Sequence, residues 1–295
     1  MTTSTHSLNS TIVRSHFSAP RSVRAAFSVL EHTAPALGAR WATRLWCTVP
    51  RTTASRVDGP TGSGSLGAVD LPGGGSVVTE SWGVGPAVYL VHGWGGWRGQ
   101  LGAFVDPLVS RGYRAIAFDM PSHGDSAPGA LGPRRSHLAE FADTLTAMIA
   151  HYGPPAGIVG HSLGCAATAV AVRDGVSVPR LAFISPTVQP ISMTSAMAEG
   201  FGFGTRIHTR MIRRLESLVG RPMSDFDLLA MADEVPMPRT LVVHDRGDRD
   251  VPYEDADLLV STWPQADLVS TSGLGHRRIL RDSDVVELVA GFVAP

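Results

Sequence analysis

Short apolar runs alternate with longer segments of helical pattern over the last two thirds of the chain. The apolar runs predict strands over residues 88–91, 115–118, 156–159, 181–184, 240–243 and 267–271. Apolar positions recur at helical spacing between them, near residues 100–110, 135–151, 163–173, 254–262 and 284–293. Strands that alternate with helices favour a mostly parallel sheet with helices on both faces. The pattern therefore predicts an α/β fold.

A helical pattern also precedes this alternating region. Its apolar positions are Val23, Phe27, Leu30, Leu37, Trp41 and Leu45. Pro35 stands where a second helix begins, and Pro50 stands where it ends. We expect residues 21–50 to form a helical extension whose apolar stripe packs on the sheet. Docking to a membrane surface or to a partner protein is the alternative for this stripe.

The other N-terminal segments have little apolar pattern. Residues 1–20 are rich in serine and threonine and contain no acidic residue, so we expect a disordered leader, although a transit peptide is the alternative. Residues 52–76 are rich in Gly, Ser and Thr and predict a loose connection followed by an early hairpin. No apolar stretch is long enough to span a membrane, and we expect a cytoplasmic protein.

A serine flanked by glycines lies between a predicted strand and a predicted helix. The segment reads Gly160-His161-Ser162-Leu163-Gly164. A sharp strand-to-helix turn of this kind strains the backbone of the serine and leaves room only for very small residues two positions to either side. Such a nucleophile elbow indicates acyl transfer through an activated serine.

Candidate partners for Ser162 follow later in the chain. One predicted strand leads into a loop with Asp245, Asp248 and Asp250, and the last predicted strand is followed by Gly273, Gly275 and then His276. A histidine can take the proton of a serine hydroxyl, and a carboxylate can hold the imidazole in the required tautomer. Because aspartates in one loop are usually surface charges, the residues alone leave all three candidates open.

The order serine, acid, histidine resembles the α/β-hydrolase superfamily. The resemblance assigns Asp248, in an Asp-x-x-Val-Pro segment, as the acid that orients His276, with Asp250 as the more serious competitor. It also implies the fold: an α/β-hydrolase core over residues 51–186 and 239–295. A short helical cap insert over residues 187–238 is expected to cover the active site.

Two further loops match the superfamily. His92-Gly93-Trp94 follows the strand at 88–91 and resembles its oxyanion loop, which implies that the backbone N–H groups of Trp94 and Leu163 stabilise the oxyanion. We expect His92 to brace this loop rather than to catalyse. The loop at 119–126 resembles one that is structural in the superfamily, so Asp119 and His123 receive no catalytic role.

The predicted cap holds most of the methionines in the chain. Flexible, polarizable side chains suit an adaptable apolar pocket, although any one of them could equally fill the core of the cap. The predicted pocket residues are Trp94, Trp97, Met193, Met197 and Phe201. Four arginines between residues 206 and 214 are expected to form the solvated face of the cap.

Composition excludes several classes of function. The chain contains no lysine, which rules out Schiff-base chemistry and pyridoxal attachment, and its formal net charge of -1 gives no reason to expect nucleic acid. The two cysteines do not form a disulfide framework. Residues 62–67 spell a dinucleotide-binding G-x-G-x-x-G, but no strand precedes the motif and no helix follows it. We expect neither a cofactor nor a bound metal.

The sequence thus predicts a serine hydrolase that cleaves carboxylic esters of small to medium, largely apolar substrates. A thioester, amide or carbon–carbon bond is the alternative target of the same three residues. A non-enzymatic ligand receptor or signalling partner on this fold is the other alternative, because fold and triad do not determine a substrate. The sequence does not predict an oligomeric state.

Overall fold

A computed structural model describes residues 17–50 and 62–295 of the chain. Its centre is an eight-stranded sheet in the order β1-β2-β4-β3-β5-β6-β7-β8. The strands are β1 (Ser65–Asp70), β2 (Ser76–Trp82), β3 (Ala87–Val91), β4 (Arg114–Phe118), β5 (Pro155–His161), β6 (Arg180–Ile184), β7 (Arg239–Asp245) and β8 (Ala266–Thr271). β1 and β2 form the expected early hairpin, and β2 also pairs antiparallel with β4. All other pairings are parallel, which confirms the predicted α/β fold.

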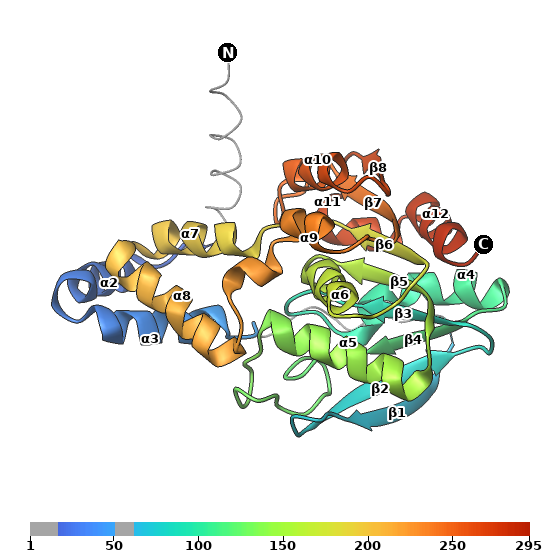
Figure 1. Ribbon diagram of the computed structural model, residues 1–295, viewed down its shortest axis with the longest axis horizontal. Helices are drawn as coiled ribbons and strands as arrows, with labels where there is room; N and C mark the ends of the chain where they lie inside the picture. Colours follow the sequence, from blue (N-terminus) through green and yellow to red (C-terminus); the bar gives the residue numbers. More distant parts are fainter. Residues whose placement is uncertain (1–16, 51–61) are drawn as a thin grey trace, which may run out of the picture.

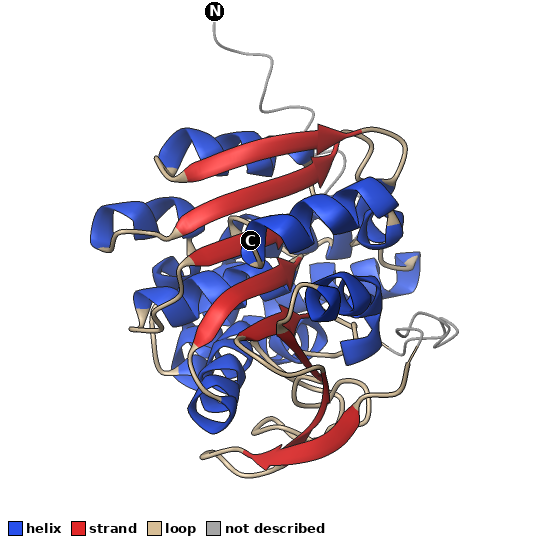
Figure 2. Cartoon of the chain, turned by 90° about the vertical axis from the view of Figure 1, so that its right-hand side faces the viewer, coloured by secondary structure: helices blue, strands red, loops and turns tan. Residues whose placement is uncertain are grey.

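Helices cover both faces of the sheet, as Figure 2 shows. One face is covered by α5 (Leu138–Tyr152), α6 (Leu163–Arg173), α9 (Leu228–Glu234) and α10 (Tyr253–Thr262). The other face is covered by η1 (Arg98–Phe104), α4 (Val105–Ser110), η3 (Ile279–Arg281) and α12 (Ser283–Val293). Central strands therefore bury both faces, and β3 has no exposed residue. This explains why they read as continuous apolar runs rather than as alternating patterns.

Helical segments fill the chain between β6 and β7, where the cap was expected. They are α7 (Pro190–Phe201), α8 (Thr205–Val219), η2 (Met223–Phe226) and α9. The glycines of Gly200–Gly204 lie at the boundary of two helices, and Gly202 ends α7 in the left-handed conformation. These glycines therefore form a helix boundary.

The N-terminal extension forms two helices, α2 (Arg21–Thr33) and α3 (Pro35–Trp46). They lie beside α7 and α8, away from the sheet, as Figure 1 shows. The expectation that their apolar stripe packs on the sheet is therefore wrong. Both faces of the sheet already carry helices, so the stripe packs on the cap instead. The shared core is formed by Phe27, Ala39, Ala42, Cys47, Met197, Ala198, Phe203, Ile207, Met211 and Leu215.

Three other expectations concern the G-x-G-x-x-G motif, the segments with little apolar pattern, and membrane spans. Gly62 and Gly64 precede the edge strand β1, so the G-x-G-x-x-G motif lacks the strand–helix context of a dinucleotide site. The expected leader falls largely on residues 1–16, and part of the expected connection on 51–61, both outside the described residues. Among the helices of residues 17–50 and 62–295, none combines the length and the apolar character of a membrane span.

Candidate active site

Ser162 lies at the turn between β5 and α6. Its backbone has φ 53° and ψ −120°, a conformation that a residue with a side chain rarely adopts. A Cβ added at Gly160 would lie 3.0 Å from Cα of Cys165, and one added at Gly164 would lie 2.4 Å from the carbonyl oxygen of Val91. The close approach explains why glycine is needed two positions before and two positions after the serine.

Asp248 and His276 are joined directly. The Nδ1–H of His276 donates a hydrogen bond to Oδ2 of Asp248 over 2.8 Å, and the Asp248 side chain is fully buried. Asp245 and Asp250, the other two candidates for the acid, have different surroundings. Asp245 accepts hydrogen bonds from the Thr271 hydroxyl at 2.8 Å and from the Leu274 amide at 2.9 Å, so it ties β7 to the end of β8. Asp250 lines the neighbouring cavity.

The environment of Asp248 keeps its carboxylate charged. Burial by itself raises the pKa of Asp248, but hydrogen bonds from His244 and His276 outweigh burial and hold the pKa well below its usual value. The amides of Asp250 and Val251 also donate to Oδ1 of Asp248, over 2.8 and 3.0 Å. A permanently ionised acceptor favours the His276 tautomer that has its proton on Nδ1, which leaves Nε2 available as a base.

His276 lies next to the serine turn. It belongs to the short helix α11 (Gly275–Arg278). The Nε2–H of His161 donates to the backbone carbonyl of His276 over 3.0 Å, and the two rings lie 4.6 Å apart between centroids. Ser162 and His276 line the same cavity, but in the described part of the chain no hydrogen bond joins their side chains.

The loop after β3 packs against Ser162. A Cβ added at Gly93 would lie 2.9 Å from Cβ of the serine. Buried His92 donates from Nδ1 to the Gly93 carbonyl over 2.7 Å and accepts from the Met120 amide at Nε2 over 3.0 Å. Burial lowers the pKa of His92 to about 4, so the ring is neutral and can make both bonds. The side chain thus braces the loop, as expected.

The two predicted oxyanion donors lie at this loop and at the turn. Trp94 lines the cavity, and Leu163 is the first residue of α6 and lines it too. Among the hydrogen bonds of residues 17–50 and 62–295, neither backbone amide has an acceptor. The N-terminus of a helix also favours negative charge. Neither amide is therefore engaged by another of the described residues.

The loop at 119–126 holds its neighbours in place. Buried Asp119 accepts from the backbone amide of Arg98 over 2.6 Å and from the amide of Asp125 over 2.8 Å. It also forms an ion pair with the Arg98 guanidinium. The His123 ring is buried and donates from Nδ1 to the Pro121 carbonyl over 2.9 Å. Neither Asp119 nor His123 lines the cavity.

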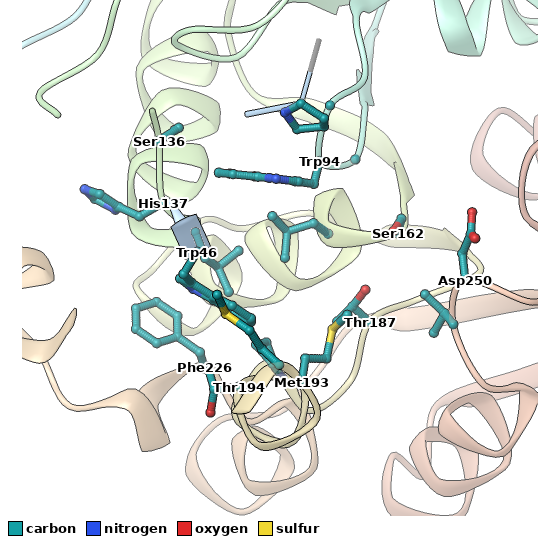
Figure 3. Close-up of a pocket in the computed structure, with 18 of the residues that line it drawn as sticks. Trp46, Trp94, Ser136, His137, Ser162, Thr187, Met193, Thr194, Phe226 and Asp250 are labelled. Atoms are coloured by element: carbon teal, nitrogen blue, oxygen red, sulfur yellow. The ribbon is translucent and has the colours of Figure 1, made fainter. Parts of the chain in front are cut away.

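A cavity of about 780 Å³ opens at Ser162 (Figure 3). Four of the predicted pocket residues line it, namely Trp94, Met193, Met197 and Phe201. Trp97 does not, so this part of the prediction is wrong. The Trp97 indole lies against Gly99, where an added Cβ would come within 2.2 Å of the ring. The guanidinium carbon of Arg98 lies 5.9 Å from the centroid of the same ring.

Sequence reasoning missed the part of the wall that comes from the N-terminal extension. The extension contributes Leu45, Trp46, Thr48 and Pro50 to the lining, and Phe17, which precedes it, lines the cavity too. Helical periodicity had selected Leu45 as an apolar position, but it carried no information about which surface that position would meet. In the described residues, no group of three or more His, Cys, Asp or Glu side chains could hold a metal ion.

Comparison with known proteins places this architecture in a family. Residues 88–290 match the profile of the alpha/beta hydrolase family. The chain is 28% identical over 147 residues to an acetyltransferase component of the acetoin cleaving system of Cupriavidus necator, covering 48% of this chain and 36% of that protein. It is 38% identical over 96 residues to a non-heme haloperoxidase of Rhodococcus erythropolis, covering 31% and 32%. The matches thus span about a third of each relative's length.

A solved structure has the same fold. An esterase from Exiguobacterium antarcticum superposes with a TM-score of 0.57 at 17% identity, covering 77% of this chain and 99% of that one. The family match covers most of the chain and contains the serine turn, the Asp248–His276 pair and the loop after β3. The chain belongs to the alpha/beta hydrolase family.

Proposed function

We propose that the protein is a serine hydrolase that cleaves carboxylic esters of small to medium size with a largely apolar group. Ser162 acts as nucleophile, His276 as general base and acid, and Asp248 as the carboxylate that orients the histidine. The observation that carries this proposal is the 2.8 Å hydrogen bond between His276 and Asp248 at a cavity that Ser162 also lines. The strained backbone of Ser162 supports it, because such strain is retained mainly at functional turns.

The reaction proceeds in two steps. The Ser162 oxygen attacks the ester carbonyl while Nε2 of His276 takes the hydroxyl proton, and the resulting oxyanion lies against the amides of Trp94 and Leu163. His276 then gives its proton to the departing alcohol, which leaves an acyl group on the serine. In the second step His276 activates a water that displaces Ser162, releases the acid and restores the enzyme.

The lining of the cavity supports an uncharged, apolar substrate. Aspartate, glutamate, lysine and arginine contribute only Asp250 and Arg277 among the described lining residues, and both lie in the segments that follow β7 and β8. Aliphatic, aromatic and methionine side chains form most of the remaining wall. The cytoplasm is the proposed location, supported by two cysteines, Cys47 and Cys165, that are both buried and unpaired.

Turnover of nitrophenyl esters of increasing acyl length tests the proposal. Ser162→Ala should lower kcat by roughly 10⁶-fold, as loss of the nucleophile does in other serine hydrolases. The matched control is Ser192→Ala, an exposed serine of α7 that does not line the cavity, and it should retain full activity. Ser162→Ala activity near that of the wild type would refute the proposal. Faster turnover of the matching thioester or amide would move the assignment to that bond.

A further inference from the structure

Part of the cavity wall comes from outside the region that the family profile matches. The match begins at residue 88, whereas Phe17, Leu45, Trp46, Thr48 and Pro50 also line the cavity. Figure 3 places Trp46 across the cavity from Ser162 and Asp250. The wall opposite the serine is therefore built in part by a segment outside the region that the family profile matches.

We infer that this N-terminal extension, through Trp46, limits the length of the apolar chain that a substrate can extend across the cavity from Ser162. The inference rests on the proposed ester hydrolysis and adds the residue that determines substrate size. The substrate class is an ester with an unbranched apolar chain, which the largely apolar wall around Trp46 favours.

Trp46 is supported by a second aromatic ring. Its indole stacks on Phe17, with ring centroids 6.1 Å apart and an angle of 23° between the rings. Both rings line the cavity, and both are partly buried. A paired aromatic surface resists displacement better than a single long side chain, because few torsions are free and the pair gains stacking energy. A substrate chain that reaches this wall must therefore stop or bend.

The backbone just after Trp46 is attached to the hydrolase core. The amide of Val49 donates to the carbonyl of Arg134 over 2.9 Å, and the amide of Ser136 donates to the carbonyl of Cys47 over 3.0 Å. These two bonds bridge the end of α3 to the segment that precedes α5. Trp46 is thus held by the same backbone that holds the side of the cavity formed by Ser136 and its neighbours.

The other end of the extension is attached to the cap. The buried Glu31 carboxylate accepts hydrogen bonds from the amides of Gly204, Arg206 and Ile207, which are the unpaired donors at the start of α8. The Arg24 guanidinium donates to the carbonyl of Gly200 over 2.7 Å at the end of α7. The extension is therefore attached to the cap through α2 and to the hydrolase core just after Trp46, so the wall at Trp46 is a fixed part of the cavity.

The experiment measures how fast nitrophenyl alkylphosphonates with ethyl, octyl, dodecyl and hexadecyl chains modify the full chain. In this reaction the Ser162 oxygen displaces nitrophenolate from phosphorus, and the mass of the protein increases by the phosphonyl group. Trp46→Ala should raise the rate with the dodecyl probe relative to the octyl probe by at least about fourfold, the value of one additional buried methylene. The ethyl probe should be unaffected.

The control is Trp41→Ala, which removes an equal volume from the same helix. Trp41 stacks on Phe27 with centroids 4.3 Å apart and does not line the cavity, so its loss should leave the chain-length ratio unchanged. Trp46→Leu serves as a second, milder variant, and its ratio should lie between those of the wild type and Trp46→Ala.

Each outcome separates this inference from the proposed function. Modification of Ser162 with a wild-type ratio in both Trp46 variants overturns the inference and leaves the hydrolase proposal intact. An equal change of ratio in Trp41→Ala also overturns it, because general loosening of the extension would then explain the effect. Failure of every probe to modify Ser162 in the wild-type protein refutes the proposed function itself.

Discussion

Replacement of Glu31 by alanine tests how strongly the extension is held on the cap. Glu31 is only 9% exposed, and its carboxylate accepts three backbone hydrogen bonds at the start of α8, with lengths of 3.0, 2.8 and 3.2 Å. After the substitution, water can reach the amides of Gly204 and Arg206, which are exposed residues. The amide of fully buried Ile207 is left without an acceptor.

The lost free energy of the contact has two parts, the unsatisfied amide of Ile207 and the missing acceptor at the start of α8. An unsatisfied buried amide costs about 1–3 kcal/mol. Loss of a helix N-terminal acceptor costs about 1 kcal/mol more. The contact between extension and cap should therefore weaken by about 2–4 kcal/mol in Glu31→Ala, and by less in Glu31→Gln, which keeps one acceptor oxygen.

Hydrogen exchange followed by mass spectrometry measures this loss where it occurs. Peptides from α2 and from the start of α8 should exchange roughly 30- to 1,000-fold faster in Glu31→Ala, the ratio that corresponds to the lost free energy. The control is Glu287→Ala, which breaks an exposed ion pair of 2.8 Å with Arg111 and should change little. Exchange of the α8 peptide within threefold of the wild type in Glu31→Ala would show that Glu31 does not hold the cap, since an effect so small is below about 1 kcal/mol.

Three further predictions concern catalysis and stability. Asp248→Asn should lower kcat with a nitrophenyl ester by roughly 10⁴-fold, whereas Asp250→Asn should have a far smaller effect; the reverse order would contradict the assignment of the acid. Gly164→Ala should lower the free energy of unfolding in urea by about 1–3 kcal/mol, because its Cβ would lie 2.4 Å from a carbonyl oxygen of β3, and an unchanged midpoint would contradict that close packing. Burial lowers the pKa values of His92 and His123 from 6.5 to about 4 and about 3, so only the unfolded chain binds these protons as pH falls. Urea unfolding should therefore show stability falling below about pH 6.5, by up to about 1.4 kcal/mol per pH unit for each histidine, and constant stability down to about pH 4.5 would refute this.

The serine turn could be predicted from sequence because its requirements are local. The strained turn is specified by a serine and two glycines within five residues, directly after a strand. The close contacts at Gly160 and Gly164 show why larger residues do not fit there. The acid was harder to predict. Asp245 and Asp248 both lie near the end of β7, and only their three-dimensional partners distinguish them.

The docking of the extension could not be predicted because periodicity identifies an apolar face but not the surface that covers it. Phe27 is buried as the helical stripe predicts, but its partners include residues of the cap, and Leu37 of the same stripe is exposed. The prediction that Trp97 lines the pocket was wrong for a related reason. Closeness in sequence to Trp94 does not determine which way a side chain points. The lining role of Trp46 likewise depends on contacts between segments far apart in the chain.

Detection of an acyl-enzyme shows directly whether Ser162 is the nucleophile. The protein is mixed with a nitrophenyl ester, stopped with acid at short times, and analysed by intact mass and peptide mapping. One added acyl group is expected on the peptide that contains Ser162, formed at least as fast as the ester is hydrolysed, and no adduct is expected in Ser162→Ala. An acyl group on a different residue, or hydrolysis that continues in Ser162→Ala, would contradict the claim that Ser162 is the nucleophile.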